Sequence, residues 1–311
     1  MTSALRILPR LVYGQGHAYA NPLTGSGTTA SVAKLTRDDV VRWHRTWVRP
    51  NNATLVVVGD TTAAEIVPKL EKLFAGWQPG EVPKKNLAPV ALPSAPRVFV
   101  VDRPGSIQSV VIAGLAAPPR ANPDEIPQTA LNTILGGVFI SRLNMNLRED
   151  KHWSYGARTT FVDARGPRTF FAYAPVQADK TAEAVTEVRS ELTGIRGAKP
   201  PTPDELVMAK SALTLPLPGR WETSRAVVSS ITSIVRFGFD DRYWDALPDK
   251  VQALTAADLT RAAGIIDPAR LTWVIVGDRA KVEPGLRALG LGSIQAVDAD
   301  GNVVPGPSAG R

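Results

Sequence analysis

The three histidines of this chain are its candidate metal ligands, and their spacing argues against a metal site. His17, His44 and His152 have no second histidine or carboxylate at the helical spacing of a zinc motif, and His-x-x-Glu-His is absent. A zinc hydrolase needs three protein ligands and an open position for water. The chain has no cysteine, which excludes thiol catalysis, disulfides and cysteine-bound zinc. The sequence therefore predicts no catalytic residue and no metal ligand in this chain.

Other catalytic motifs are missing too. There is no Gly-x-Ser-x-Gly and no P-loop, and Gly136-Gly137 lacks the spacing of a dinucleotide loop, so we interpret it as a helix stop. The stretch Asp298–Asn302 resembles a calcium loop only faintly, with its glycine misplaced. We expect a turn there.

Charge and hydropathy exclude two further classes. The formal charge is +7 over 311 residues, but the longest basic run is Lys84-Lys85, so no nucleic-acid-binding face is predicted. No apolar run approaches the roughly 20 residues of a membrane span. Arg6 and Arg10 interrupt the N-terminal apolar residues, so no signal-peptide core is seen. The compartment stays open; a periplasmic or otherwise exported location is only a guess.

The chain contains an internal repeat. Leu35–Val40 resembles Leu254–Leu259, and in each copy a threonine stands at a helix N-cap with an aspartate three residues later. Each copy continues into a β-branched run closed by Gly-Asp, Leu55–Asp60 in the first and Leu271–Asp278 in the second. Such short apolar runs predict buried strands. Upstream, Tyr13-Gly14 matches Phe237-Gly238.

The repeat predicts one partial and one complete unit. A proline-rich stretch separates them and indicates an extended linker. The second unit has a long opening part before its Leu254 landmark, whereas the first has little before Leu35. The predicted divisions are the second half of a first unit (1–77), the linker (78–96), a complete unit (97–291) and a tail (292–311).

The complete unit shows an α+β pattern. Antiparallel or mixed sheets with helices packed on one face follow from its order of elements. The predicted strands are 97–102, 108–115, 155–162 and 168–174, and the last two are joined as a hairpin through 164–167. The predicted helices begin near Asn122, Thr202 and Glu222, and others are predicted over 143–149, 182–195 and 281–289.

One long motif carries a family resemblance. Ile134–Ala157 closely resembles the Gly-Gly…Ser-Arg-Leu…Leu-Arg-Glu…Ser-Tyr-Gly motif of pitrilysin/insulinase-type zinc peptidases. His17-Ala18-Tyr19…Gly25 and Arg49–Leu55 resemble the second half of that family's preceding domain. The resemblance covers about residues 10 to 291 and implies repeated α+β units around a chamber.

The resemblance implies roles for two residues. In the family, zinc and the base come from a His-x-x-Glu-His helix in one unit, while an Arg and a Tyr seven residues apart in the facing half hold the substrate's peptide carbonyl. Arg148 and Tyr155 match that pair. The implied substrate is a peptide, and the implied partner is a zinc-bearing half, upstream in the same polypeptide or on a separate subunit. The family commonly has glycine where His152 stands, at a position that needs a left-handed backbone.

Three functions remain in competition. We favour a non-catalytic, substrate-binding part of a zinc-dependent peptidase, because a guanidinium and a phenol can stabilise charge on a carbonyl oxygen. In the alternative for this site, Arg148 pairs with Glu149 at the surface and Tyr155 is only a strand aromatic. A structural or assembly-scaffold relative of the same family would fit that alternative. An RNA-binding protein would need a clustered basic face, which the sequence lacks.

Overall fold

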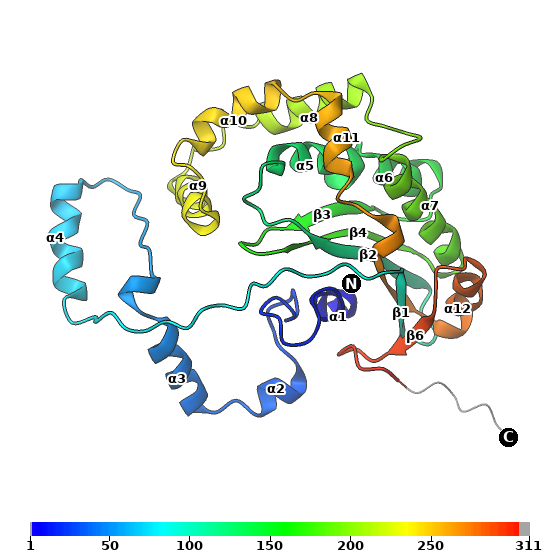
Figure 1. Cartoon of the computed structure of the whole chain (residues 1–311), viewed down its shortest axis with the longest axis horizontal. Helices are drawn as coiled ribbons and strands as arrows, with labels where there is room; N and C mark the ends of the chain where they lie inside the picture. The colour runs from blue at the N-terminus through cyan, green and yellow to red at the C-terminus, as the bar shows by residue number, and fades with distance from the viewer. Residues whose placement is uncertain (1, 305–311) are drawn as a thin grey trace. The chain divides into compact units, whose positions relative to one another are not determined.

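A computed structural model describes residues 2–304 of the chain. It contains two compact units (Figure 1). We call Met1–Gly27, Leu87–Thr214 and Leu247–Arg311 the sheet unit, and Thr28–Asn86 with Leu215–Ala246 the helical unit. Most of the linker expected over 78–96 has neither helix nor strand.

The sheet unit is built on a six-stranded mixed sheet with the order β3-β4-β2-β5-β1-β6. Strand β5 lies at its centre, paired antiparallel with β2 and parallel with β1. The first strand has its predicted bounds, and the hairpin of β3 and β4 forms as predicted. The strands are β1 (Arg97–Asp102), β2 (Gln108–Ala117), β3 (Arg158–Val162), β4 (Arg168–Gln177), β5 (Thr272–Gly277) and β6 (Ile294–Val297).

One face of the sheet carries the main core. Side chains at alternate strand positions, among them Val100, Leu115 and Ile275, pack with the apolar residues of the helices on that face. Trp273 of β5 is the largest fully buried side chain there. These helices include α5 (Glu125–Asn132), α7 (Thr181–Gly194), α8 (Pro203–Thr214), α11 (Ala256–Ala263) and α12 (Arg279–Ala288).

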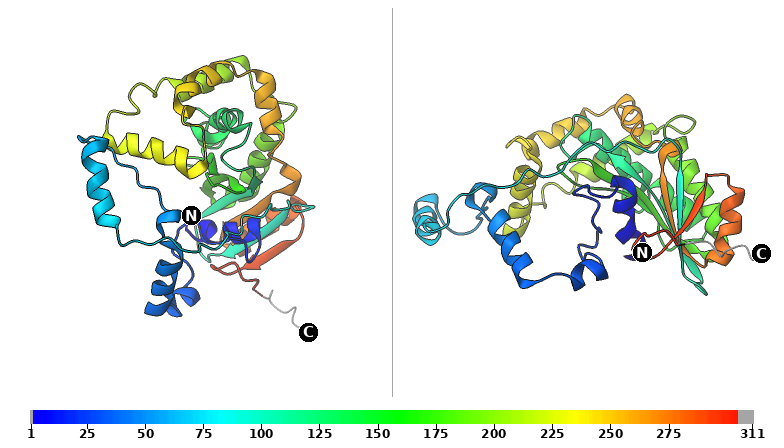
Figure 2. Two further views of the ribbon diagram at one scale, coloured as in Figure 1. Left: turned by 60° about the vertical axis from the view of Figure 1, so that its left-hand side comes forward. Right: turned by 60° about the horizontal axis from the view of Figure 1, so that its bottom comes forward.

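The opposite face is covered by the N-terminal helix α1 (Thr2–Tyr13). Its Ile7 and Leu8 are buried against the strand residues that point away from the main core, such as Ile112 and Val274. Both pictures show α1 on the side of the sheet away from α5 and α7 (Figures 1 and 2). Helix α1 was expected to belong to the first repeat unit, and the structure packs it on the sheet of the second.

Strand β6 lies in the segment that we assigned to a tail. It pairs parallel with β1, so the sheet extends beyond residue 291. The turn expected after it forms around Asp298, whose carboxylate accepts hydrogen bonds from the backbone of Asp300 and Asn302. Arg6 of α1 forms an ion pair with Asp300, which ties this turn to the sheet unit.

The helical unit contains helices but no strand among its described residues. Between α3 and α4 the chain is drawn without an arrow (Figure 1). The prediction of a buried strand at Leu55–Asp60 was therefore wrong for this structure. A strand needs neighbours for its backbone hydrogen bonds, and this unit supplies none. The helices are α2 (Thr29–Ala33), α3 (Arg37–Trp47), α4 (Ala63–Phe74) and α9 (Ser224–Phe237), with a 3₁₀ turn at Pro50–Asn52; α10 (Tyr243–Gln252) runs from this unit into the sheet unit.

The α+β fold class, with a mixed sheet and packed helices, is confirmed. Gly14 and Gly238, matched in the repeat, each follow a helix with positive φ, 78° and 72°. No helix within residues 2–304 is long and apolar enough to cross a membrane.

Candidate functional site

Arg148 stands on a short, irregular helical segment. Helix α6 (Arg142–Asn144) continues into a π-helical turn, Met145–Asp150. Such wider turns occur often at functional sites. The turn ends where the Lys151 amide donates to the Asn146 carbonyl at 3.0 Å.

The connection from Arg148 to Tyr155 is held at several points. His152 follows the helix with φ 56°, the left-handed conformation expected at this position. Its ring Nδ1 lies 3.1 Å from the Arg148 carbonyl oxygen. The next two amides, of Trp153 and Ser154, both donate to the Leu147 carbonyl, at 3.0 and 3.2 Å. The two proposed donors are therefore joined by a fixed turn.

A buried asparagine fixes the far side of this turn. Asn144 Oδ1 accepts from the Ala157 amide at 3.1 Å, and its Nδ2 donates to the Phe139 carbonyl at 2.7 Å. It thus joins the loop before α6 to the chain just before β3. We did not single out Asn144 from the sequence, and its place inside the long motif was the only available signal.

Tyr155 was expected to begin a strand, but it lies before β3, which starts at Arg158. Ser154 Oγ donates to the Gly156 carbonyl and accepts from the Gly156 amide, both at 3.1 Å, and this local turn delays the strand to Arg158. The Tyr155 side chain is 86% exposed, and its hydroxyl makes no hydrogen bond within the described residues. A strand aromatic that served only packing would be covered.

Arg148 makes two contacts of its own. Its Nε lies 3.2 Å from Glu149 Oε1, with both side chains 41% exposed, and its guanidinium lies 4.7 Å from the centre of the Phe139 ring. The ion pair that we weighed against a substrate role is therefore present. Exposed pairs of this kind contribute about 0 to 1 kcal/mol. No hydrogen bond joins Arg148 to Tyr155 in the part of the chain that the structure describes.

A cleft of about 860 Å³ lies beside Tyr155. Phe139, Gly136 and Gly137 line one part of it, and β3 and β4 line another. The helical segment Thr133–Gly137 ends at Gly137 as expected, although neither glycine has the positive φ of a left-handed C-cap. A Cβ on Gly136 would lie 2.6 Å from Thr159 Oγ1, which shows that glycine is needed for the close approach to β3.

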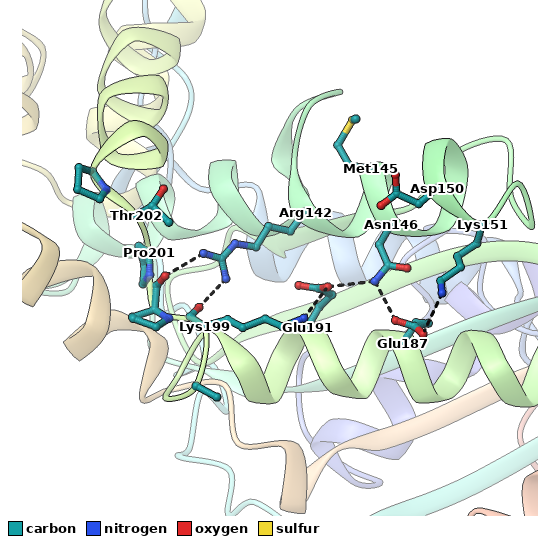
Figure 3. Close-up of a pocket in the computed structure, with 13 residues that line it drawn as sticks. Arg142, Met145, Asn146, Asp150, Lys151, Glu187, Glu191, Lys199, Pro201 and Thr202 are labelled. Atoms are coloured by element: carbon teal, nitrogen blue, oxygen red, sulfur yellow. Dashed lines mark hydrogen bonds and ion pairs between the residues drawn. The ribbon is translucent and has the colours of Figure 1, made fainter.

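A second cavity, also about 860 Å³, lies behind the Arg148 helix (Figure 3). Asn146 points between two glutamates of α7 and donates to Glu187 at 2.9 Å and to Glu191 at 3.0 Å. Arg142 forms a two-point ion pair with Glu205, and this hydrogen-bonded partner raises the pKa of Arg142. These charges are matched within the chain, so the cluster positions the Arg148 helix on α7.

The side chains of His17 and His152 have local partners. His17 stacks on Tyr13 with ring centres 5.0 Å apart, and its Nε2 lies 3.1 Å from the Ala88 carbonyl oxygen. His44 lies in the last turn of α3, in the other unit. Within residues 2–304 no group of three or more histidine, aspartate or glutamate side chains could hold a metal ion.

The fold is that of an α+β domain with a mixed sheet and packed helices. The chain belongs to the peptidase M16 family: the model of the peptidase M16 inactive domain matches residues 34–213. That model describes the inactive domain of the family. No curated protein sequence matches the chain.

Solved structures share the fold. A peptidase M16 inactive domain from Pseudomonas fluorescens has a TM-score of 0.78 at 21% identity, covering 87% of this chain and 63% of that chain. A protease from Helicobacter pylori has a TM-score of 0.74 at 20% identity, covering 83% and 62%. A chain of Complex III2 from Candida albicans has a TM-score of 0.71 at 15% identity, covering 92% and 72%. The chain thus spans less than two thirds of the length of the first two.

Proposed function

We propose that this chain is the non-catalytic, substrate-binding part of a zinc-dependent peptidase, and that Arg148 and Tyr155 hold the carbonyl of the peptide bond to be cleaved. The observation that carries the proposal is the state of Tyr155. Its phenol is almost fully exposed at the edge of a cleft, on a turn that several hydrogen bonds fix. A large aromatic side chain held out in this way is typical of a contact residue.

The two side chains suit a developing negative charge. When water attacks a peptide carbonyl, charge builds on its oxygen, and fixed donors aimed at that oxygen lower the barrier. Tyr155 offers an O–H and Arg148 offers several N–H groups. The exposed pair with Glu149 is weak enough for Arg148 to exchange it for a substrate oxygen.

The nucleophile must come from elsewhere. Amide hydrolysis by water needs an activating metal or base. In this proposal a zinc-bearing His-x-x-Glu-His half provides it. Peptides are the proposed substrates, bound between the two halves. This chain's part is to bind and orient the carbonyl.

The test uses the enzyme assembled from this chain and its zinc-bearing half. Arg148→Ala and Tyr155→Phe are each expected to lower kcat by about 100-fold to 1000-fold, as loss of one oxyanion donor typically does. Glu149→Gln is the matched control, because it removes the ion pair and keeps both donors; its kcat is expected to stay within about threefold. Circular dichroism and zinc content should match the parent in all three. Parental rates for both Arg148→Ala and Tyr155→Phe would refute the clamp.

A scaffold role is the second candidate. The likeness to a chain of Complex III2, over 92% of this chain, favours it, because that protein is part of a larger complex. A scaffold has no need of Arg148 and Tyr155 together. If the chain is a scaffold, the Arg148→Ala and Tyr155→Phe variants will assemble normally with their partners, and the assembled complex will show no peptidase activity.

A further inference from the structure

The cleft beside Tyr155 has one charged side chain among the described residues that line it. Glycine, threonine, asparagine and apolar or aromatic residues make up the rest of its wall. The exception is Arg158, the first residue of β3, whose side chain is exposed. A substrate side chain that enters this cleft therefore meets one positive charge in otherwise uncharged surroundings.

Tyr173 of β4 holds this guanidinium in place. Arg158 and Tyr173 are paired directly in the β3–β4 hairpin, and the guanidinium carbon lies 5.3 Å from the centre of the Tyr173 ring. Burial raises the pKa of Tyr173, so the phenol is neutral at ordinary pH and does not cancel the charge beside it. Within residues 2–304 the Arg158 side chain has no ion pair with a carboxylate, and its N–H groups are available to a ligand.

The position of Arg158 relates it to the proposed carbonyl site. Arg158 comes three residues after Tyr155, and three residues of extended chain span at most about 10 Å. An extended substrate covers the same distance in about three residues. The substrate residue that reaches Arg158 therefore lies within about three positions of the carbonyl that Tyr155 holds.

We propose that the cleft is a specificity pocket for an acidic residue of the substrate, and that Arg158 determines this specificity by pairing with its carboxylate. A guanidinium binds a carboxylate through two parallel N–H···O bonds, whereas a neutral amide cannot accept both. Phe139, 56% exposed on the cleft wall, offers an apolar surface for the stem of the same side chain. The inference rests on the proposed function and adds to it a substrate class, peptides with glutamate or aspartate close to the cleaved bond.

The charge of the whole chain favours the same substrates. Its formal value is +7, so an acidic peptide is attracted before it reaches the cleft. Because Arg158 is exposed, salt should screen its pairing, and the preference for acidic peptides should shrink as ionic strength rises. A pocket that selected by shape alone would keep its preference in high salt.

The first experiment measures binding to this full chain alone. The probes are short peptides, blocked at both ends, that differ only in a central glutamate, glutamine or lysine, and NMR follows the Arg158 Nε–Hε signal. The glutamate peptide should bind at least about tenfold more tightly than the glutamine peptide, a difference of about 1.4 kcal/mol, and it alone should shift that signal. Arg158→Gln should abolish the difference, and Arg158→Lys should keep part of it.

Two controls complete this experiment. Arg189→Gln removes an exposed arginine of α7 that does not line the cleft, with the same change in net charge, and should keep the parental preference. The glutamine peptide with a free carboxyl terminus tests whether the cleft binds chain ends instead. It should bind no more tightly than its blocked form.

The second experiment measures cleavage by the enzyme assembled from this chain and its zinc-bearing half. In a peptide library randomised around the cleaved bond, one position within three residues of that bond should favour glutamate or aspartate by at least about tenfold in kcat/KM. Arg158→Glu should reverse the preference toward lysine at the same position. A variant that had only lost structure would lower all rates together and would not invert the order of substrates.

Three results would overturn the inference: equal binding of the glutamate and glutamine peptides, a preference that survives Arg158→Gln, or equally tight binding of a free carboxyl terminus. The outcomes also separate this pocket from the clamp. A glutamate preference that depends on Arg158, together with parental turnover of the Arg148→Ala and Tyr155→Phe variants, would refute only the clamp. Loss of turnover in those variants without any charge preference would refute only the specificity pocket.

Discussion

Gly136→Ala should destabilise the sheet unit, because the added methyl group has no room. The new Cβ would lie 2.6 Å from Thr159 Oγ1, 2.8 Å from the Arg158 carbonyl carbon and closer still to the Thr159 amide nitrogen. Ordinary contact begins near 3.4 Å, so even the carbonyl carbon would have to move by about 0.6 Å. Most of these atoms are backbone, and a change of rotamer cannot relieve the clash.

The cost follows from the structure. Overpacking a core costs about 1 to 3 kcal/mol, and a clash with backbone belongs at the upper end. Separation of the two segments would also strain the hydrogen bond from Thr159 Oγ1 to Asn132 Oδ1, 2.9 Å long and worth about 1 kcal/mol. Alanine's better helix propensity returns up to about 1 kcal/mol. The expected net loss in the free energy of unfolding is about 3 kcal/mol.

The assay is urea denaturation followed by tryptophan fluorescence, with buried Trp273 as a reporter of the sheet unit. Gly197→Ala is the matched control, because a Cβ there meets nothing within 4 Å and the backbone φ is not positive. It should change the free energy of unfolding by less than about 0.5 kcal/mol. Equal midpoints for the two variants would show that the segment of Gly136 does not lie against β3 as described, and the cleft beside Tyr155 would lose one wall.

Three further predictions concern the backbone, pH and metal. His152→Gly should leave the free energy of unfolding within about 1 kcal/mol of the parent, because glycine accepts φ 56° freely but orders at greater entropic cost. His152→Val should cost about 2 kcal/mol in thermal or urea unfolding, and equal effects of the two variants would contradict the left-handed turn. Burial raises the pKa of Tyr13 to about 12, so the unfolded chain loses this proton first, and the free energy of unfolding should fall by up to about 2.7 kcal/mol as pH rises from 10 to 12. Tyr13→Phe should flatten this alkaline slope in urea titrations, and an unchanged slope would contradict the role of Tyr13. Elemental analysis of the purified chain after zinc exposure and dialysis should find well under one zinc per chain, and a stoichiometric, chelator-sensitive zinc would overturn its placement as the metal-free half.

Local chemistry made much of the fold predictable. The Thr–Asp capping boxes at α3 and α11 form as the sequence indicates, with Asp39 and Asp258 accepting from their threonine amides at 2.9 Å. Thr202 and Glu205 likewise cap α8 in both directions. These interactions span three residues and need no tertiary partner. These three helix beginnings were therefore readable from the sequence, whereas α5 begins at Glu125 without the side-chain cap that we expected near Asn122.

Tertiary contacts were not readable in the same way. Gly136-Gly137 does end a helical segment as the sequence indicated, but no pattern showed that Gly136 also makes room for a strand more than twenty positions later. The buried Arg168 stacks 4.2 Å from the Phe161 ring centre and donates to Gln128 at 2.5 Å, and no pattern along the chain indicated this. The exposure of the candidate donors Arg148 and Tyr155 could not be predicted either, because exposure depends on the packing of distant segments.

The two copies of the repeat separate local from non-local stabilisation within one chain. Helix α3 and its following turn form in the first copy without buried residues, through caps and an Asp39–Arg42 ion pair, whereas the strand forms only in the second, where β1 and β2 are present. Isolated helices shorter than about 12 to 15 residues are marginal in water, and α3 has 11. The same sequence pattern thus forms its capped helix from local contacts alone, whereas its strand forms only where neighbouring strands take up the backbone hydrogen bonds.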